Sequence, residues 1–362
     1  ARSPYDEFLL AAKCRAGKSV MVLSHVVDRG HRLTLVTSRY RSPFQSWRED
    51  SRNFEPFSGL VVIDMGAADW KKQLDYWYTQ TTRQIVLCST VQGLMRRVNS
   101  VPHHVDLLVY DEAHIGDKSS QFLTLRDRLV DTPVLKVSGT AYDQLWDTTE
   151  ETRFVYDYFQ EQLDVQQGRG RHRPAMNVVL AGYESERYSE IYGDDADSMN
   201  NLFLTRDGQF VDEQLVREFV TRYFHNRELR RDNRLLLGSR HIYMTLPSVE
   251  ACHLFRDIID DVIPAMVVTG DTGREAEDID QFVREHDHTG SICLTYSANV
   301  LGVTQSLWDT VINCRGGKSI QFWTQFAFRA GSGDHDWRVI DFVPTRALES
   351  LRETFCLAND LN

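Results

Sequence analysis

The chain has 362 residues, of which 42% are hydrophobic and 26% are charged. This balance excludes a disordered or fibrous protein, and the length exceeds one ordinary core, so two domains of roughly 150 residues each are expected. The formal net charge is −11, which excludes a surface that attracts nucleic acid everywhere, so that any such contact must come from a local basic groove.

The six cysteines are scattered without Cys-x-x-Cys spacing, which predicts reduced thiols and neither a disulfide framework nor a zinc site. No apolar run approaches the roughly 18 residues that a membrane span needs, and the N-terminus lacks a signal-peptide pattern. We therefore expect a cytoplasmic protein with no membrane partner.

The first half of the chain alternates apolar runs with amphipathic or loop segments. A strand at residues 8–12, a glycine-containing turn and a helix at residues 19–28 open it. Further strands are expected at residues 32–37, 60–64, 84–89, 105–110 and 134–138. Because these runs are continuously apolar rather than alternating, they indicate a parallel sheet covered on both faces.

A charged and aromatic stretch followed by a Gly- and Arg-rich run predicts a linker. We place the first domain at residues 1–150, the linker at 151–173 and the second domain at 174–362, with an insertion at about 183–234.

The second domain repeats the pattern of the first. Its expected strands are residues 177–181, 241–245, 265–269, 291–296, 310–313 and 337–342, and its expected helices are 212–227, 248–260 and 274–285. The fold class is therefore α/β, with two doubly wound parallel sheets.

A phosphate-binding loop is predicted between the first strand and the first helix. Its sequence, Ala-Lys-Cys-Arg-Ala-Gly-Lys-Ser, differs from the common G-x-x-x-x-G-K-[ST] pattern in having Ala12 in the first position. Backbone N–H groups at a helix N-terminus cradle phosphates, Lys18 reaches the β- and γ-phosphates, and the Ser19 hydroxyl ligates Mg²⁺. The ordinary alternative is a turn and a helix start. We assign nucleotide contacts to Cys14, Arg15, Ala16, Gly17, Lys18 and Ser19.

A second Gly-Lys-Ser occurs in the segment Arg-Gly-Gly-Lys-Ser at residues 315–319, also after an apolar run. Counting back to the first loop position gives Ile312, a strand residue, so this loop is too short to wrap a phosphate. We expect Lys318 and Ser319 to start a helix instead.

Asp111 and Glu112 follow four apolar residues and precede Ala113 and His114. At the C-terminal end of a parallel strand, the two carboxylates face the crevice in which nucleotides bind. Asp111 can hold Mg²⁺, and Glu112 can orient and deprotonate the attacking water. An Asp-Glu pair after a strand is usually a solvated turn, but the whole D-E-A-H segment together with the upstream loop favours ATP hydrolysis.

These segments resemble superfamily 2 helicases and translocases of the DEAD/DEAH type, whose motifs follow a fixed order along two RecA-like domains with a nucleotide cleft between them. The resemblance covers residues 12–19, 37–39, 89–93, 111–114 and 138–141, and then 242–245, 269–271, 294–304 and 325–329. The forms of the loop, of Ser-Gly-Thr-Ala and of the last motif are most similar to the motor subunits of restriction-type or phage-encoded enzymes.

The resemblance implies an ATP-dependent helicase or translocase with ATP and Mg²⁺ as cofactors. DNA is favoured over RNA, in a bacterial or phage-infected cell, with a partner subunit or an attached nuclease or methyltransferase module as a further expectation. The implied catalytic residues are Asp111, Glu112, Gln325 and Arg329, and the coupling residues are His114, Ser138 and Thr140. The implied nucleic-acid contacts are Ser38, Arg39, Thr90, Gln92, Thr245, Thr269, Gly270 and Thr295, for whose hydroxyls helix capping or strand-end structure is the ordinary alternative.

The last motif departs from the family pattern. Phe328 stands where the family usually has Gly, and Ser332 stands where it has a second arginine, so Arg329 is the one arginine left. Arg315, Arg338 and a partner subunit are the candidates for the missing charge. The departure supports an alternative function, an ATP-binding switch or scaffold that hydrolyses weakly; an RNA helicase is a further alternative.

Overall fold

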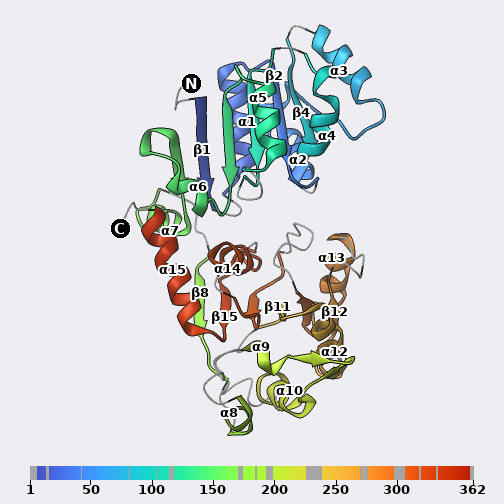
Figure 1. Ribbon diagram of the computed structural model, residues 1–362, viewed down its shortest axis with the longest axis vertical. Coiled ribbons are helices and arrows are strands. Elements are labelled where there is room, and N and C mark those ends of the chain that lie inside the picture. Colours follow the sequence, from blue (N-terminus) through green and yellow to red (C-terminus); the bar gives the residue numbers. More distant parts are fainter. Residues whose placement is uncertain are drawn as a thin grey trace. The chain divides into compact units, whose positions relative to one another are not determined.

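The computed structural model describes residues 6–13, 16–41, 43–80, 82–102, 104–113, 118–169, 174–183, 186–192, 199–225, 239–269, 272, 276–296, 306–317, 319–331 and 333–358. The chain divides into two compact units, Ala1–Gln160 and Glu161–Asn362 (Figure 1). Each unit is built around a parallel sheet of its own.

The sheet of the first unit has seven strands in the order β3-β4-β2-β5-β6-β1-β7, and every pairing is parallel. The strands are β1 (Glu7–Ala12), β2 (Leu33–Ser38), β3 (Leu60–Asp64), β4 (Gln84–Thr90), β5 (Leu107–Asp111), β6 (Val134–Ser138) and β7 (Arg153–Tyr156). The first six were predicted from the apolar runs. β7 lies where the linker was expected, but it pairs with β1, so the first unit extends past residue 150 to Gln160.

Helices cover both faces of this sheet, as the continuous apolar strands predict. They are α1 (Lys18–Arg29), α2 (Pro43–Asn53), α3 (Trp70–Thr79), α4 (Val91–Arg97), α5 (Ser120–Arg128) and α6 (Tyr142–Trp146), with short turns η2 (Glu55–Phe57), η3 (Val98–Ser100) and η4 (Glu150–Thr152). Alternate residues of one strand enter different cores: Val36 packs with α1 and α2, whereas Leu35 packs with α3, α4 and α5. α7 (Tyr158–Gln166) crosses the boundary between the units.

The sheet of the second unit has six parallel strands in the order β12-β13-β11-β14-β15-β8. They are β8 (Met176–Leu180), β11 (His241–Thr245), β12 (Ala265–Val267), β13 (Ser291–Thr295), β14 (Thr310–Asn313) and β15 (Trp337–Asp341), all of them predicted. A short antiparallel hairpin, β9 (Thr205–Arg206) with β10 (Gln209–Phe210), lies apart from this sheet.

The segment expected to be an insertion is part of the core of the second unit. Phe203 and Phe219 come from this segment and pack in one cluster with Met244 of β11 and Phe255 of α12. The helices of the unit are α8 (Glu186–Tyr192), α9 (Met199–Leu202), α10 (Glu213–Val220), the π-turn η6 (Thr221–His225), α12 (Val249–Ile259), α13 (Ala276–Glu285), α14 (Ile320–Ala327) and α15 (Pro344–Ala358).

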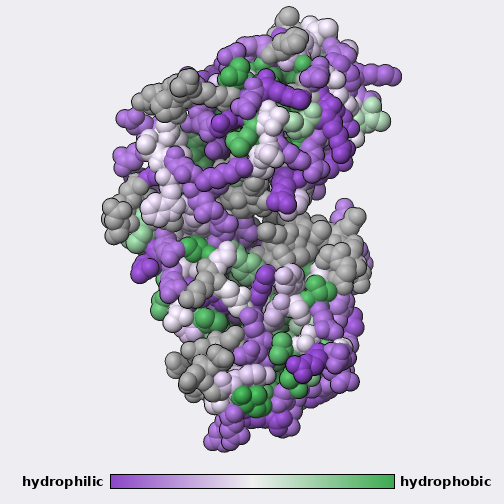
Figure 2. Space-filling model, in the orientation of Figure 1, coloured by the Kyte–Doolittle hydropathy of each residue, from purple (hydrophilic) through white to green (hydrophobic). Residues whose placement is uncertain are grey.

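The face of the molecule in Figure 2 is mostly hydrophilic, with hydrophobic atoms in small separate groups. The described cysteines are free thiols, and those in or beside strands, such as Cys88 and Cys293, are buried. Within the described ranges, no helix combines the length and the apolar character that crossing a bilayer requires.

Candidate nucleotide-binding site

The predicted phosphate-binding loop leads from the end of β1 into the first turn of α1. Gly17 caps this helix with φ of 80°, a left-handed conformation that glycine adopts without strain. Lys18 and Ser19, the first two residues of α1, have half-buried side chains, as does Ala16. Cys14 and Arg15 lie outside the described residues. The loop therefore has the strand-to-helix setting that a phosphate site needs.

Asp111 is the last residue of β5 and is only 7% exposed. β5 and β1 flank β6, so Asp111 and the phosphate-binding loop lie at the same carboxyl edge of the sheet. Glu112 follows with φ of 55°, which is a strained conformation for a residue other than glycine. Its backbone N–H donates to Asp111 Oδ1 at 2.9 Å. The turn thus places Glu112 directly after the strand, near enough for its charge to act on Asp111.

Burial and, to a smaller extent, the negative charge of Glu112 raise the pKa of Asp111 to about 6. The hydrogen bond from Trp47 and the charge of Lys18 act in the opposite direction. No cation among the described residues forms an ion pair with Asp111. The raised pKa therefore reflects a buried carboxylate that has no ion-pair partner among the described residues and whose charge Lys18 offsets only in part.

Two side chains of α2 complete this site, and sequence reasoning missed both. Trp47 Nε1 donates to Asp111 Oδ2 at 2.8 Å, and the indole is buried. The Ser19 hydroxyl donates to the carboxylate of Asp50. Trp47 and Asp50 are three residues apart and therefore share one face of the helix. The available signal was the apolar pair Phe44 and Trp47 at helical spacing, which predicts a helix facing the sheet.

The donors at this edge fit Mg²⁺. They are oxygen atoms only, the Asp111 carboxylate and the Ser19 hydroxyl, and Mg²⁺ is usually held by one or two carboxylates together with water and substrate phosphates. The buried, un-neutralised carboxylate supplies the charge that such a cation requires. In the described part of the chain, no group of three or more His, Cys, Asp and Glu side chains is placed to hold a metal ion without other ligands.

The segment after Asp111 is tied to the end of β6. Ala113 N–H donates to the carbonyl of Val137 at 2.9 Å, and Gln144 Nε2 of α6 donates to the Ala113 carbonyl at 3.3 Å. The two predicted coupling residues Ser138 and Thr140 are buried, and the Thr140 N–H donates to Ser138 Oγ at 3.1 Å. Gln144 was not predicted, and His114 lies outside the described residues.

The predicted nucleic-acid contacts of the first unit divide by exposure. Arg39 and Gln92 are exposed, whereas Ser38 is fully buried. Thr90 Oγ1 accepts the N–H of Gly93 at 3.1 Å, which is the helix-capping alternative. The side chains that can meet a ligand here without rearrangement are therefore Arg39 and Gln92.

In the second unit the predicted threonines face inward. Thr245, Thr269 and Thr295 are all buried, and Thr245 Oγ1 donates to Asn313 Oδ1 at 2.9 Å. The Thr245 hydroxyl thereby joins β11 to β14, and the assignment of the three threonines as contacts to nucleic acid stays a prediction. Gly270 lies outside the described residues.

Gln325 and Arg329 lie on and just after α14, and both are half-buried. The charge of Arg329 acts on Tyr243, whose pKa burial raises to about 12. Phe326 and Phe328 between them are buried in the core. The helix start predicted at the second Gly-Lys-Ser is confirmed, since Ser319 Oγ caps α14 by accepting the N–H of Phe322.

The two arginines considered as sources of the missing charge lie at opposite ends of neighbouring strands. Arg338 is near the amino end of β15, where its Nη1 donates to Ser239 Oγ at 3.3 Å. Arg315 follows the carboxyl end of β14. Because ligands of doubly wound sheets bind at the carboxyl ends, Arg315 remains a candidate and Arg338 does not.

No protein-family model matches the chain, and no curated protein sequence matches it. Among solved structures, the chain is similar to Mss116p bound to single-stranded RNA and AMP-PNP, with a TM-score of 0.55 and 13% sequence identity. The match covers 98% of this chain and 69% of that chain. At this identity the likeness shows the fold alone: the two parallel-sheet units have the RecA-like helicase architecture that the motif order predicted.

Proposed function

We propose that the chain is an ATP-dependent nucleic-acid helicase or translocase that hydrolyses ATP with Mg²⁺ in its first unit. One observation carries the proposal: a buried Asp111 that forms no ion pair with a described cation lies at the same sheet edge as the glycine-capped turn that precedes Lys18. A purely structural strand end would not favour a carboxylate that is buried and has no ion-pair partner, because that arrangement is unfavourable without a ligand.

Each residue has a distinct role in the proposed reaction. Backbone N–H groups at the start of α1 and the Lys18 ammonium bind the phosphates, while Ser19 and Asp111 are the residues that would hold Mg²⁺. The cation supplies charge stabilisation on the phosphates when it is bound. Glu112 accepts a proton from the water that attacks the γ-phosphorus, and the bond from that phosphorus to the ADP oxygen breaks. Gln325 and Arg329 of the second unit remain proposed contacts to this phosphate.

The proposal includes both DNA and RNA as the nucleic acid. The motif forms that resemble restriction-type and phage-encoded motors support DNA, and the single-stranded RNA bound to Mss116p supports RNA equally. The exposed Arg39 and Gln92 at the strand ends of the first unit support backbone contacts, which serve either strand type.

Steady-state ATP turnover tests this function, measured with Mg²⁺ alone and with added single-stranded DNA or RNA. We expect one of the two strands to stimulate turnover, and the better activator identifies the substrate. Lys18→Ala should abolish turnover by weakening nucleotide binding. The surface variant Lys71→Ala removes the same charge from an ion pair with Asp75 and should leave turnover unchanged. Equal turnover in wild type and Lys18→Ala would place the chemistry elsewhere.

A second function, an ATP-binding switch, is favoured by the last motif. Arg329 is the single arginine on the described part of that segment, and its neighbours Phe326 and Phe328 are buried. An arginine finger contributes about 10³ or more to phosphoryl transfer, so its loss would leave binding without rapid hydrolysis. Tight ATP binding with negligible turnover, unchanged by either nucleic acid, would select the switch.

A further inference from the structure

The loop after β14, residues 315–317, carries an arginine whose side chain is held in place by two aromatic rings. The Arg315 guanidinium carbon lies 4.4 Å from the centroid of Tyr296 and 4.9 Å from that of Phe322. Arg315 Nη1 also donates to the Tyr296 carbonyl at 2.9 Å. Contact with two rings and the hydrogen bond to the Tyr296 carbonyl restrict the guanidinium, so its remaining N–H groups point in defined directions.

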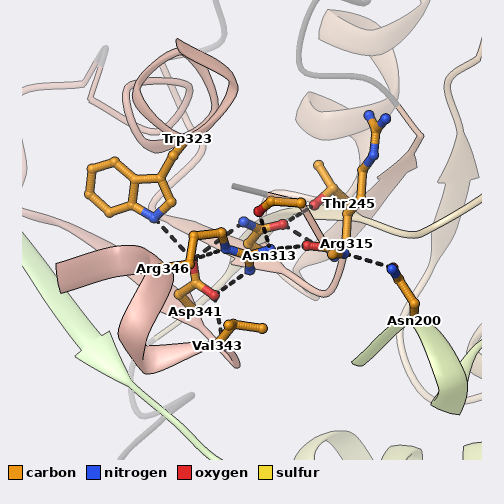
Figure 3. A network of polar contacts seen from close by, with 10 residues as sticks. Asn200, Thr245, Asn313, Arg315, Trp323, Asp341, Val343 and Arg346 are labelled. Carbon is orange, nitrogen blue, oxygen red and sulfur yellow. Dashed lines mark hydrogen bonds and ion pairs between the residues drawn. The ribbon is translucent and has the colours of Figure 1, made fainter. Parts of the chain in front are cut away.

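The backbone beneath Arg315 is fixed by a buried ion pair between Arg346 of α15 and Asp341 of β15 (Figure 3). Both side chains are almost fully buried. Arg346 Nε donates to Asp341 Oδ2 at 3.2 Å, and Arg346 Nη1 donates to the carbonyls of Arg315 and Gly317. Figure 3 shows the Arg315 side chain extending away from this network while its main chain is held within it.

Further hydrogen bonds fix the two ends of the loop. Arg315 N–H donates to Asn313 Oδ1 at 3.2 Å, and Gly316 N–H donates to Asn200 Oδ1 at 2.7 Å. A Cβ on Gly316 would lie 2.1 Å from Asn200 Nδ2, and Gly317 has φ of 116°. Gly317 is therefore favoured by this conformation, whereas a side chain at position 316 would displace that of Asn200. The conformation of this loop is therefore fixed by its own contacts, although the loop is too short to wrap a phosphate as the first loop does.

The two arginines differ in whether a carboxylate neutralises their charge, and this difference points to a ligand. Arg346 is neutralised by Asp341, whereas within the described residues no carboxylate pairs with Arg315. Arg315 is half-buried, and the neighbouring Tyr296 keeps 38% of its surface exposed. A fixed, partly desolvated guanidinium without a counter-ion is suited to a phosphate, because its planar donors match two phosphate oxygens.

We propose that Arg315 binds a backbone phosphate of single-stranded nucleic acid, with the exposed Tyr296 ring beside it as a surface on which a base stacks. Both residues follow carboxyl ends of strands in the sheet of the second unit, the edge where ligands of doubly wound sheets bind. Base stacking on an aromatic ring next to a cationic groove is the usual mode for single strands. The proposal rests on the proposed function in one respect, that a nucleic acid is the partner.

The test is the affinity of the full chain for fluorescently labelled oligothymidylate and oligouridylate, measured by anisotropy over a range of salt concentrations. Arg315→Gln should weaken binding about tenfold, which corresponds to the loss of one charged hydrogen-bonding group. The slope of log affinity against log salt should fall by about 0.7, as expected for one phosphate contact to a single strand. Arg315→Lys, which keeps the charge without the planar donors, should retain the slope and lose part of the affinity.

Arg284→Gln is the matched control. Arg284 pairs with Asp280 on α13 of the same unit, and α13 ends before β13 begins, so Arg284 lies toward the amino edge of the sheet. Its replacement removes the same charge and should change neither affinity nor slope. Thermal unfolding of each variant checks the fold, and Arg315→Lys carries the test if Arg315→Gln does not fold.

Three results would overturn the proposal in distinguishable ways. Unchanged affinity and slope in Arg315→Gln, with wild-type binding intact, contradict the Arg315 site and leave the proposed function standing. If Arg315→Gln raises the KM for ATP in the absence of nucleic acid and leaves oligonucleotide binding unchanged, Arg315 binds a phosphate of the nucleotide instead. Failure of the wild type to bind either oligonucleotide would contradict both the site and the proposed function.

Discussion

Two strand-end aspartates, one in each unit, have similar hydrogen bonds and opposite electrostatic settings. Asp111 accepts the indole N–H of Trp47 at 2.8 Å, and Asp341 accepts that of Trp323 at 3.0 Å. Both carboxylates are buried at the end of a parallel strand. Asp341 forms an ion pair with Arg346, whereas Asp111 pairs with no described cation.

The presence or absence of an ion-pair partner distinguishes a structural aspartate from one that binds a ligand. Asp341 also accepts from Asn313 Nδ2 and from the Val343 N–H, so its hydrogen-bonding capacity is used within the protein. Burial without neutralisation leaves Asp111 with a raised pKa, which a bound cation would offset. We therefore expect Asp341 to hold the second unit together and Asp111 to serve a ligand.

The largest expected effect is on stability, from Asp341→Asn. This change leaves the buried Arg346 guanidinium without its carboxylate, and breaking such a pair costs about 3–5 kcal/mol. Urea unfolding that follows the second unit measures the loss. Asp280→Asn breaks the exposed pair with Arg284 and should cost less than about 1 kcal/mol. Equal losses in the two variants would show that the buried pair is not a structural element.

Asp111→Asn should lower ATP turnover rather than stability. The neutral side chain removes an uncompensated buried charge, so we expect stability at neutral pH to be kept or raised. ATP turnover with Mg²⁺ should fall about 100-fold, since the loss of one preorganised electrostatic group has that order of effect. A stability loss as large as that of Asp341→Asn would remove the distinction between the two aspartates.

The pH dependence of stability sharpens the same comparison. The folded pKa of Asp111 is about 6, above its ordinary value of 3.8, so the folded state holds this proton more tightly than the unfolded state. The resulting penalty is full above the folded pKa and disappears as pH falls below the ordinary value. The stability gain of Asp111→Asn over wild type should therefore shrink by about 1 kcal/mol between pH 7.5 and pH 5.

Urea midpoints of wild type and Asp111→Asn at several pH values measure this change. A gain that is constant across the range would mean that the folded pKa of Asp111 is not raised.

The two indoles are expected to contribute less to stability than the buried ion pair. Trp47→Phe and Trp323→Phe each remove one hydrogen bond to a carboxylate, and each should lower the free energy of unfolding by about 1.5–3 kcal/mol. Trp47→Phe alone should also lower ATP turnover, by about tenfold, because it holds the orientation of Asp111. Equal turnover losses in both variants would mean that the Trp47 bond has no special part in the site.

The apolar strand runs and the motif order predicted much of the fold, because both are local features of the sequence. β3, β6, β11 and β14 begin and end where the apolar runs do. The strand β7 was missed, since Arg153–Tyr156 is short and its only distinguishing property is that β1 has a free edge to pair with. That property depends on the sheet and not on the segment.

The candidate site was predicted in part for the same reason. Lys18, Asp111 and Glu112 belong to local motifs, whereas the bond from Trp47 to Asp111 joins residues far apart in the sequence. The direction of a strand-end hydroxyl is likewise set by its neighbour: Thr245 faces inward because Asn313 of the adjacent strand accepts from it. A single sequence does not encode such partners in a readable pattern.

The central claim, ATP hydrolysis at Asp111 and Glu112, is tested most directly by comparing ATP affinity with ATP turnover in Glu112→Gln and wild type. The amide keeps the shape of the side chain and cannot accept the proton of the attacking water. We predict an ATP dissociation constant close to that of the wild type and a turnover lower by about 100-fold or more. Wild-type turnover in Glu112→Gln, in the presence of the activating nucleic acid, would contradict the assignment.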